Sequence, residues 1–243
     1  MEDILLGEFL GSVFLILFGG GVVANTLLTK SKGINAGWLA ISTGWGFAVM
    51  GGVFVAKSVG SVQADLNPAV TLAKYLLGGI YSASEILPIM CAQIMGCFFG
   101  AILVWLTYLP HWKETTDPSL KLAVFSTGPA IRHSPSNLMT EMIGTAILVF
   151  GIGAIFGKAT NNGAISPAMC PYLVGILVWA IGLSLGGSTG YAINPARDLG
   201  PRIAHALLPI AGKGKSDWKY SWIPVLGPVL GGIIGAYLWK TFL

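Results

Sequence analysis

The chain has few ions, few histidines and few cysteines. Only 10% of its 243 residues are charged, whereas a soluble domain carries about 25%, so a water-facing surface could not be covered. Its three histidines, His111, His133 and His205, lack metal-ligand spacing, and we expect no metal site and no cofactor. The absence of a glycine-rich phosphate loop and of a nucleophile elbow argues against an enzyme. The absence of a basic, aromatic-interleaved stripe argues against a nucleic-acid partner.

The cysteines and the N-terminus exclude two further possibilities. Cys91, Cys97 and Cys170 all lie inside apolar segments, so we expect them to pack as small hydrophobic residues rather than to form disulfides. Acidic rather than basic residues precede the first apolar run, and that run is longer than the core of a signal peptide. We therefore interpret it as a retained transmembrane helix.

What the sequence does contain is apolar length. Hydrophobic residues make up 54% of the chain, and the mean hydropathy is +0.74. A helix needs about 20 apolar residues to cross roughly 30 Å of hydrocarbon. Six segments satisfy this requirement, at about 4–28, 38–57, 84–108, 138–157, 167–186 and 222–242. The fold class is therefore an all-α membrane protein in the plasma membrane, in contact with the lipid bilayer.

Two shorter apolar stretches, 67–78 and 194–208, lie between these spans. Both begin with the same triplet, at Asn67, Pro68, Ala69 and at Asn194, Pro195, Ala196. Asparagine is a good N-cap, proline suits the first helical position, and Gly78 supplies a C-terminal stop for the first stretch. A ten-residue helix from Pro68 to Leu77 is about 15 Å long, half the thickness of the hydrocarbon. We therefore expect two re-entrant half-helices.

The two halves of the chain resemble each other. "EFLGSVFLILFGGG" from Glu8 is similar to "EMIGTAILVFGIGA" from Glu141, an offset of 133 residues (141 minus 8), and the two triplets are offset by 127 (194 minus 67). Because each half has three full spans, the halves must insert with opposite orientations. We expect one transmembrane domain over 1–243, with inverted repeats at about 1–108 and 138–243 joined by a loop at 109–137. The half-helix N-termini would then meet near the midplane.

Few charged side chains lie within these apolar segments, and the position of each one requires a physical explanation. Arg197 opposes the positive end of its half-helix dipole, so it either snorkels to headgroups or faces a pore. Facing a pore, it would repel cations and donate hydrogen bonds to neutral oxygens. Asp198 would orient local groups or favour the helix N-terminus. Glu8 and Glu141 lie at matching places in the two halves, where support of irregular backbone is favoured over a proton relay.

With these features the sequence resembles the aquaporin family over essentially its whole length. The resemblance is carried by "NPAV" at 67–70 and "GYAINPARDLGP" at 190–201, and it is closest to the glycerol-facilitator branch. It implies a right-handed bundle of six transmembrane helices and two half-helices, with both termini in the cytoplasm. It also implies a homotetramer with one pore in each subunit. Asp65 departs from the family, which often has histidine two residues before the first triplet.

By the same resemblance, four residues would form an outer selectivity filter: Trp45, Gly182, Tyr191 and Arg197. The match of Trp45 requires a two-residue insertion before the first triplet, and without it Phe47 is the candidate. Trp45 and Tyr191 would face the carbon side of a polyol, and Arg197 its hydroxyls. Gly182 would leave room for three carbons, and the two triplet asparagines would each donate a hydrogen bond at the midplane.

The expected function is a passive channel for glycerol and similar small uncharged solutes, with water, that excludes protons and ions. One alternative is a channel chiefly for water or another neutral solute: dihydroxyacetone, urea, hydrogen peroxide or undissociated lactic acid. A secondary transporter would need a coupling carboxylate where the sequence has Asn67 and Asn194. A structural junction protein would show no permeability.

The distribution of basic residues favours the opposite orientation to the one that the resemblance implies. With cytoplasmic termini, four basic loop residues lie inside and eight outside, the reverse of the positive-inside bias. The inner group is Lys57, Lys74, Lys158 and Lys240, and the outer group is Lys30, Lys32, Lys113, Lys121, Arg132, Lys213, Lys215 and Lys219.

Overall fold

The computed structural model describes residues 1–157 and 165–243, and in these residues it contains helices and no strand. Lys158, one of the inner lysines, lies outside the described residues. The α-helices are α1 (Glu2–Leu27), α2 (Gly37–Val59), α3 (Pro68–Leu77), α4 (Ala83–Thr107), α5 (Leu109–Glu114), α6 (Pro118–Phe125), α7 (Ser134–Phe156), α8 (Cys170–Leu185), α9 (Pro195–Leu207) and α10 (Ile223–Phe242).

Among the described residues, five helices are long and apolar enough to cross a membrane: α1, α2, α4, α7 and α10. The sixth predicted span, 167–186, is divided into a short 3₁₀ helix, Pro167–Met169, and the 16-residue α8. Pro171 lies in the first turn of α8, where its missing N–H costs no helical hydrogen bond. The chain is thus a multi-pass membrane protein of six apolar helices and two half-helices.

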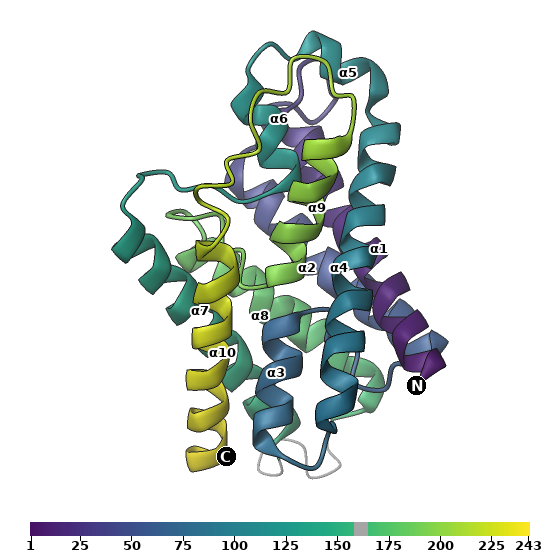
Figure 1. Cartoon of the computed structure of the whole chain (residues 1–243), viewed down its shortest axis with the longest axis vertical. Helices are drawn as coiled ribbons and strands as arrows, with labels where there is room; N and C mark the ends of the chain where they lie inside the picture. Colours follow the sequence, from purple (N-terminus) through teal and green to yellow (C-terminus); the bar gives the residue numbers. More distant parts are fainter. Residues whose placement is uncertain (158–164) are drawn as a thin grey trace.

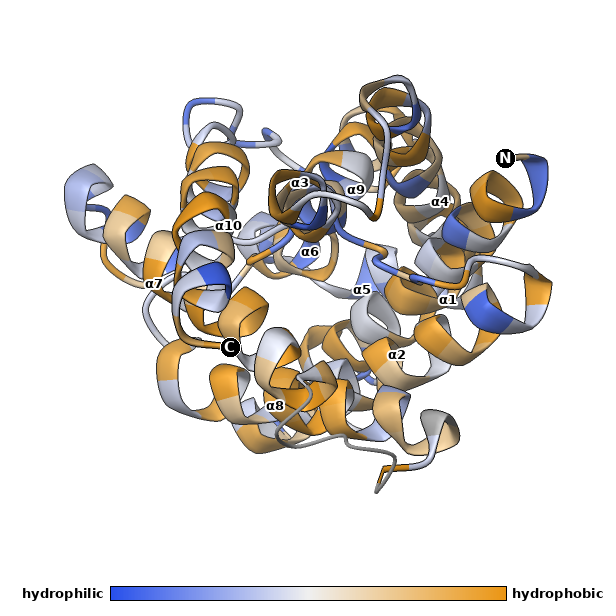
Figure 2. Ribbon diagram, turned by 90° about the horizontal axis from the view of Figure 1, so that it is seen from below, coloured by the Kyte–Doolittle hydropathy of each residue, from blue (hydrophilic) through white to orange (hydrophobic). Residues whose placement is uncertain are grey.

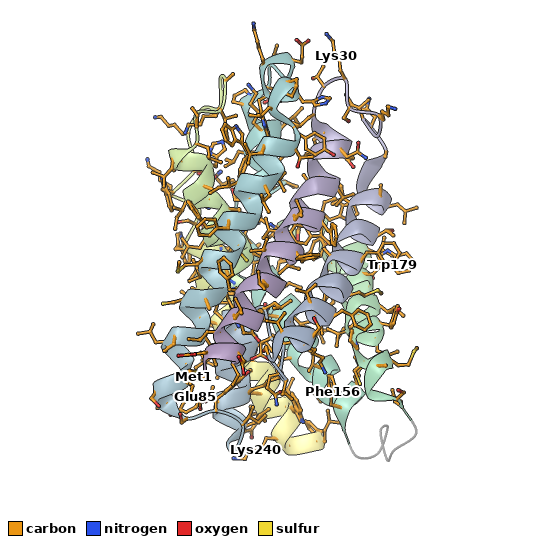
Figure 3. The ribbon with its side chains drawn as sticks, turned by 90° about the vertical axis from the view of Figure 1, so that its right-hand side faces the viewer. Met1, Lys30, Glu85, Phe156, Trp179 and Lys240 are labelled. Atoms are coloured by element: carbon orange, nitrogen blue, oxygen red, sulfur yellow. The ribbon has the colours of Figure 1, made fainter. Side chains whose placement is uncertain are left out.

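The six apolar helices surround the half-helices. In the first half α1 packs against α2 and α4, in the second half α7 packs against α10 and α8, and α2 lies against α8 to join the halves. Hydrophobic residues predominate along these helices (Figure 2). Lys30 lies at one end of the molecule and Glu85 and Lys240 at the other, with Trp179 near mid-height (Figure 3). Both termini lie at the same end (Figure 1), which an even number of crossings requires.

The two half-helices lie inside the bundle and run toward opposite ends (Figure 1). Each packs mainly against the last span of the other half, α3 against α10 and α9 against α4. Glycines permit this close approach. A Cβ atom on Gly232 of α10 would lie 2.8 Å from the Ala69 carbonyl oxygen, and one on Gly200 of α9 would lie 2.6 Å from the Ile94 carbonyl oxygen.

The ends of the half-helices follow local chemistry. The Asn67 side chain accepts a hydrogen bond from the Ala69 N–H at 2.9 Å, Pro68 occupies the first turn, and α3 ends at Gly78 with φ 83°. Asn194 caps α9 in the same way, since its side chain accepts the N–H groups of Ala196 and Arg197. The prediction of two half-length helices that begin at the triplets is confirmed.

The segment 109–137, expected as a loop, contains the two short helices α5 and α6, which cover the end of the bundle opposite the termini (Figure 1). The Ser119 N–H donates to the Asp117 carboxylate at 2.7 Å, and Pro118 opens α6. Trp112 of α5 is buried, and its indole N–H donates to the Trp105 carbonyl at 2.9 Å. This tertiary anchor stabilises a helix too short to form alone.

Candidate functional site

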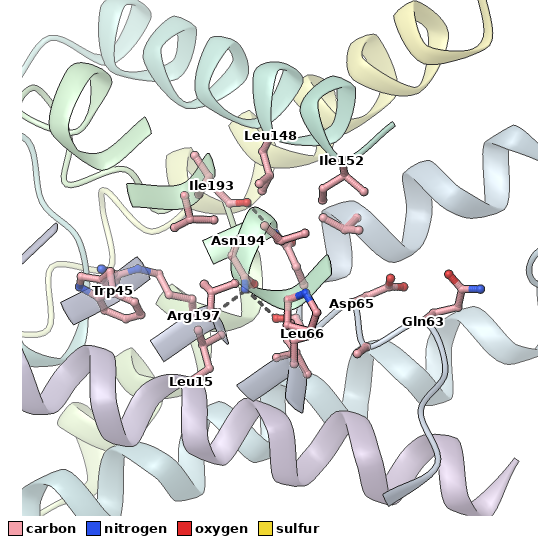
Figure 4. A pocket seen from close by; sticks show the side chains of 18 of the residues that line it. Leu15, Trp45, Gln63, Asp65, Leu66, Leu148, Ile152, Ile193, Asn194 and Arg197 are labelled. Atoms are coloured by element: carbon pink, nitrogen blue, oxygen red, sulfur yellow. Dashed lines mark hydrogen bonds between the residues drawn. The ribbon is translucent and has the colours of Figure 1, made fainter. Parts of the chain in front are cut away.

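A cavity follows the N-terminal ends of both half-helices (Figure 4). Trp45 and Arg197 lie at one end, Gln63 and Asp65 lie at the other, and Asn194 lies between them. Apolar side chains line its length, namely Leu15, Val49, Val53, Val70, Leu148, Ile152, Val174 and Val178. The cavity therefore offers polar groups from the segments that precede the half-helices and an apolar surface from the spans.

A second cavity opens on the side of α5 and α6. It is lined by the three residues Trp45, Tyr191 and Arg197, and also by Val23, Leu27, Trp38, Ile41, Ala123, Ser126, Thr127, Gly128 and Gly190. These three residues line both cavities. They therefore form the constriction between an outer vestibule and the inner cavity, and the sequence had placed all three in the filter.

Arg197 is held in this constriction by the first turn of α9. Its side chain is buried with the guanidinium carbon 3.9 Å from the centroid of the Trp45 ring. A guanidinium over an indole face is stabilised by the negative charge of the ring face. No acceptor among the described residues takes a hydrogen bond from the guanidinium group, which carries five N–H donors. These donors are available to a molecule in the cavity.

Trp45, rather than Phe47, faces the cavity. Trp45 is 4% exposed and Phe47 is 59% exposed, on the outer surface of α2. Two residues apart on a helix is about 200° of rotation, so only one of the two can face inward. Gly19 of α1 makes room for the indole, because a Cβ atom there would lie 2.2 Å from Trp45 Cζ3. Sequence reasoning had not assigned a role to Gly19.

Gly182 lines neither cavity, and its missing side chain makes room for Tyr191. A Cβ atom on Gly182 would lie 2.7 Å from Tyr191 Cζ and Oη, and one on Gly186 would lie 2.5 Å from Tyr191 Cδ1. Trp38 closes the same slot, with its ring 5.8 Å from that of Tyr191 and its indole N–H donating to the Gly182 carbonyl at 2.9 Å. Any effect of Gly182 on the constriction therefore acts through Tyr191.

The triplet asparagines meet between the half-helices. Asn67 Nδ2 donates to the Ile193 carbonyl at 2.8 Å, and Asn194 Nδ2 donates to the Leu66 carbonyl at 2.7 Å. Both side chains line the inner cavity. Since an amide NH₂ has two donors, each asparagine keeps one N–H for a molecule in the cavity. The positive ends of the α3 and α9 dipoles point at the same place.

The segments that precede the half-helices have strained backbone. Ala64, Leu66, Tyr191 and Ile193 all have φ between 38° and 52°, a left-handed conformation that non-glycine residues adopt at a cost of about 1–3 kcal/mol each. Residues 64–66 and 191–193 line the inner cavity. This conformation could not be predicted from the sequence, because none of the four residues is glycine or asparagine.

Glu8 and Glu141 hold these segments from behind. Glu8 accepts the N–H groups of Asp65 and Leu66, both at 2.8 Å, and the hydroxyl of Ser61 at 2.6 Å. Glu141 accepts the N–H groups of Ala192 and Ile193 at 3.0 and 2.8 Å and the hydroxyl of Thr189 at 2.7 Å. Both carboxylates are buried and neither lines a cavity. Their geometry is suited to support of the backbone.

Asp198 lies outside both cavities and pairs with Arg202 one turn later, not with Arg197. Its carboxylate accepts the Arg202 guanidinium at 2.7 and 2.9 Å, and both side chains are fully buried. It also accepts the N–H of Thr127 at 2.8 Å, and Arg202 donates to the Thr127 carbonyl at 2.9 Å. The pair thus ties α9 to the 126–128 segment of the outer vestibule. Sequence reasoning had missed Arg202 as the partner.

Comparisons with known proteins agree with this geometry. Residues 3–239 match the major intrinsic protein family. The chain is 55% identical to the probable glycerol uptake facilitator protein of Thermotoga maritima, with 98% of each chain covered. It is 50% identical to the glycerol uptake facilitator protein of Bacillus subtilis, covering 97% of this chain and 83% of the relative.

One more distant relative and one solved structure extend these comparisons. The chain is 40% identical to the D/L-lactic acid transporter of Lactiplantibacillus plantarum, with 98% of this chain and 97% of the relative covered. Its structure matches the X-ray structure of the aquaglyceroporin from Plasmodium falciparum with a TM-score of 0.86 and 26% identity over 99% of this chain and 96% of that one. The half-helix pair, the buried arginine and these matches together show that the chain belongs to the major intrinsic protein family, a family of membrane channels rather than enzymes.

Proposed function

We propose that the chain is a passive channel for glycerol and similar small uncharged solutes, with water. The observation that carries the proposal is the constriction itself, where unoccupied guanidinium donors of Arg197 face a cavity walled by the aromatic rings of Trp45 and Tyr191. A polyol carries C–H bonds along one side and hydroxyls along the other. The aromatic rings fit the first side and Arg197 the second. Two relatives, one named as a probable glycerol uptake facilitator and the other as a glycerol uptake facilitator, support this substrate.

Below the constriction, the path provides for the same amphipathic solute. The free N–H groups of Asn67 and Asn194 would each donate to a passing hydroxyl, while Leu148 and Ile152 face its carbon side. Two positive helix ends and Arg197 raise the energy of any cation at this place, including a hydrated proton. In this proposal Glu8, Glu141 and Asp198 are supports that do not touch the solute.

The proposal is tested by the flux of neutral solutes through the purified protein. Proteoliposomes loaded with glycerol should shrink rapidly on dilution, at a rate independent of sodium and proton gradients. A raised water permeability with glycerol flux equal to that of empty liposomes would contradict the glycerol assignment. Flux driven uphill by an ion gradient would instead indicate a secondary transporter.

A second candidate solute is undissociated lactic acid, favoured by the 40% identity to the D/L-lactic acid transporter. Its hydroxyl and carboxylic acid groups could take the hydrogen bonds of Arg197, and its methyl group could face Trp45. Light-scattering measurements at acidic and alkaline pH separate the two solutes. Glycerol flux should be the same at both pH values, whereas lactic acid flux should be confined to acidic pH, because the anion must leave water at the constriction.

Replacement of Arg197 by valine tests the role of the guanidinium. Hydrogen bonds to a charged donor contribute about 1.5–3 kcal/mol, so R197V should lower glycerol permeability by roughly 10- to 100-fold. Removal of the cation should at the same time raise proton conductance, measured with a pH-sensitive dye in the vesicle lumen. Arg132 to valine is the control, because Arg132 lies at the surface and pairs with Asp217. An R197V variant with unchanged glycerol flux would exclude a direct contact between Arg197 and the solute.

We further propose that the two halves are inverted repeats of one channel domain, with both termini in the cytoplasm of a cell whose plasma membrane holds the protein. Matching contacts of Glu8 and Glu141 support the repeat. A homotetramer is proposed as well, on the ground of family membership, since exposed apolar side chains such as Leu87, Met139 and Tyr237 are equally suited to contact with lipid. Light scattering of the detergent-solubilised protein would give the number of subunits.

A further inference from the structure

The inner end of the cavity carries a buried ion pair that the constriction does not use. Lys74 of α3 pairs with Asp65, and their side chains are 9% and 0% exposed. The charged residues that line the cavity are Lys57, Asp65, Lys74 and Arg197, so Asp65 is the sole carboxylate among the described residues that line it. Asp65, and with it the Lys74 ammonium that it binds, lies at the end opposite Trp45 and Arg197 (Figure 4 shows Asp65).

Every donor and both oxygens of the pair have partners. Besides Asp65, the Lys74 ammonium donates to the carbonyl and to the side-chain oxygen of Gln63, at 3.3 and 3.0 Å. The other Asp65 oxygen accepts the hydroxyls of Thr71 at 2.9 Å and Tyr81 at 2.7 Å. The carboxylate therefore ties the segment before the first triplet to α3 and to Tyr81, in the connection between α3 and α4.

Asp65 contributes its backbone, not its carboxylate, to the cavity wall. The residue as a whole is partly exposed while its side chain is completely buried, so its exposed surface is main chain. Glu8 holds the N–H groups of Asp65 and Leu66. The ion pair holds the same segment through the Asp65 carboxylate and through Gln63. These two anchors together fix the direction in which the carbonyl groups point.

The second half of the chain has no such device. The position that corresponds to Asp65 by the offset of 127 residues is Ala192, which has no group that could pair with α9. Its segment is held by Glu141 and leads directly into the constriction at Tyr191. The ion pair is thus an asymmetric addition to the inner half of the path.

We propose that the Asp65–Lys74 pair is a positioning device that sets selectivity at the inner mouth. It aligns the carbonyls of residues 63–65 as acceptors for the hydroxyls of a departing solute, and it keeps the Lys74 ammonium out of the path. The inference rests on the proposed glycerol channel. It places a second determinant of the glycerol-to-water permeability ratio at the end of the cavity opposite Arg197, with Asp65 acting through the backbone it positions.

The two charges must then act as a unit. Without Asp65, Lys74 has no counter-charge and can extend into the mouth, where it would retain polyol hydroxyls and narrow the path. Without Lys74, the carboxylate loses its main partner and the segment loses one anchor. Removal of both charges leaves the segment before the first triplet less firmly held, but it leaves no unpaired charge at the inner mouth. The double variant should therefore be less impaired than the two single effects combined predict.

The experiment compares D65N, K74Q and the double variant D65N/K74Q in proteoliposomes, by stopped-flow measurement of glycerol and water permeability. D65N should lower the glycerol-to-water ratio by roughly fivefold, about the effect of one hydrogen bond on a rate. Water flux through the same vesicles shows that the variant is folded and inserted. K240Q is the matched control, because Lys240 is an exposed lysine at the same end of the molecule (Figure 3), and its ratio should equal that of the wild type.

The outcomes of this experiment distinguish the proposed channel function from the proposed role of the ion pair. A wild-type protein without glycerol flux refutes the proposed function. A wild type that conducts glycerol, with an unchanged ratio in D65N or with independent effects of the two single variants, overturns the role of the ion pair. If D65N is not recovered in vesicles, Y81F serves instead, because it removes the hydrogen bond that the Tyr81 hydroxyl donates to the Asp65 carboxylate and leaves the ion pair in place. Y81F should shift the ratio in the same direction by a smaller factor, and an unchanged ratio in Y81F would likewise overturn the role of the ion pair.

Discussion

Replacing Gly182 with histidine should reduce glycerol permeability by roughly 10- to 100-fold. Overpacking of a buried site costs about 1–3 kcal/mol, and the displaced Tyr191 ring can move only toward the cavity. A Cβ atom at this position would already lie 2.7 Å from Tyr191 Cζ. Gly186 and Trp38 close the other sides of the slot, so the tyrosine ring must move toward the cavity. Stopped-flow light scattering with a glycerol gradient measures the loss.

A second substitution separates displacement of Tyr191 from a direct effect of the imidazole. In G182H/Y191T the smaller threonine leaves the slot to the histidine, and water permeability should be close to that of the wild type while glycerol permeability stays low. Gly187 to alanine is the control, because a Cβ atom there meets no atom within 4 Å. Unchanged glycerol flux in G182H would show that the Tyr191 ring does not set the width of the constriction.

Loss of the Asp198 carboxylate should have the largest effect on stability. In D198A the fully buried Arg202 guanidinium keeps its carbonyl partners but loses its counter-charge. Breaking a buried pair by removal of one partner costs about 3–5 kcal/mol. The free energy of unfolding, measured by denaturation with a strong detergent in mixed micelles, should fall by that amount, and the 126–128 segment should become accessible to proteolysis.

A surface pair in the same region supplies the comparison. Asp217 pairs with Arg132, and the Asp217 and Arg132 side chains are 26% and 56% exposed. Exposed ion pairs contribute about 0–1 kcal/mol, so D217A should change the free energy of unfolding little. Equal effects of D198A and D217A would mean that the Asp198–Arg202 pair does not hold α9 to the outer vestibule.

The sequence alone was sufficient to predict those features of the fold that are caused by residues adjacent in the chain. Apolar length predicted the spans because hydrocarbon thickness sets it, and the span at 167–186 departs most from the structure, since α8 begins at Cys170. The Asn-Pro pairs predicted the starts of α3 and α9, because an asparagine cap and a proline in the first turn act on the backbone beside them. Both predictions needed no knowledge of distant contacts.

The constriction depended on contacts between distant segments. The choice between Trp45 and Phe47 rested on an alignment gap in the sequence, and the rotation of α2 against α1 and α8 decided it. Gly182 was assigned to the filter directly, whereas the structure places Tyr191 in its slot. The helices α5 and α6 also form where a loop was expected, because burial of Trp112 stabilises them.

By itself, the sequence determined a membrane protein with six apolar helices and two half-helices. It also identified the few ionised side chains that lie within the apolar segments. The tertiary structure alone decided the partner of each ion: Arg197 stacks on Trp45, Asp198 binds Arg202, and Asp65 binds Lys74. The reason is physical. Helix length and capping are properties of neighbouring residues, whereas a charge in an apolar interior is stabilised by whichever groups the packing of helices brings within reach.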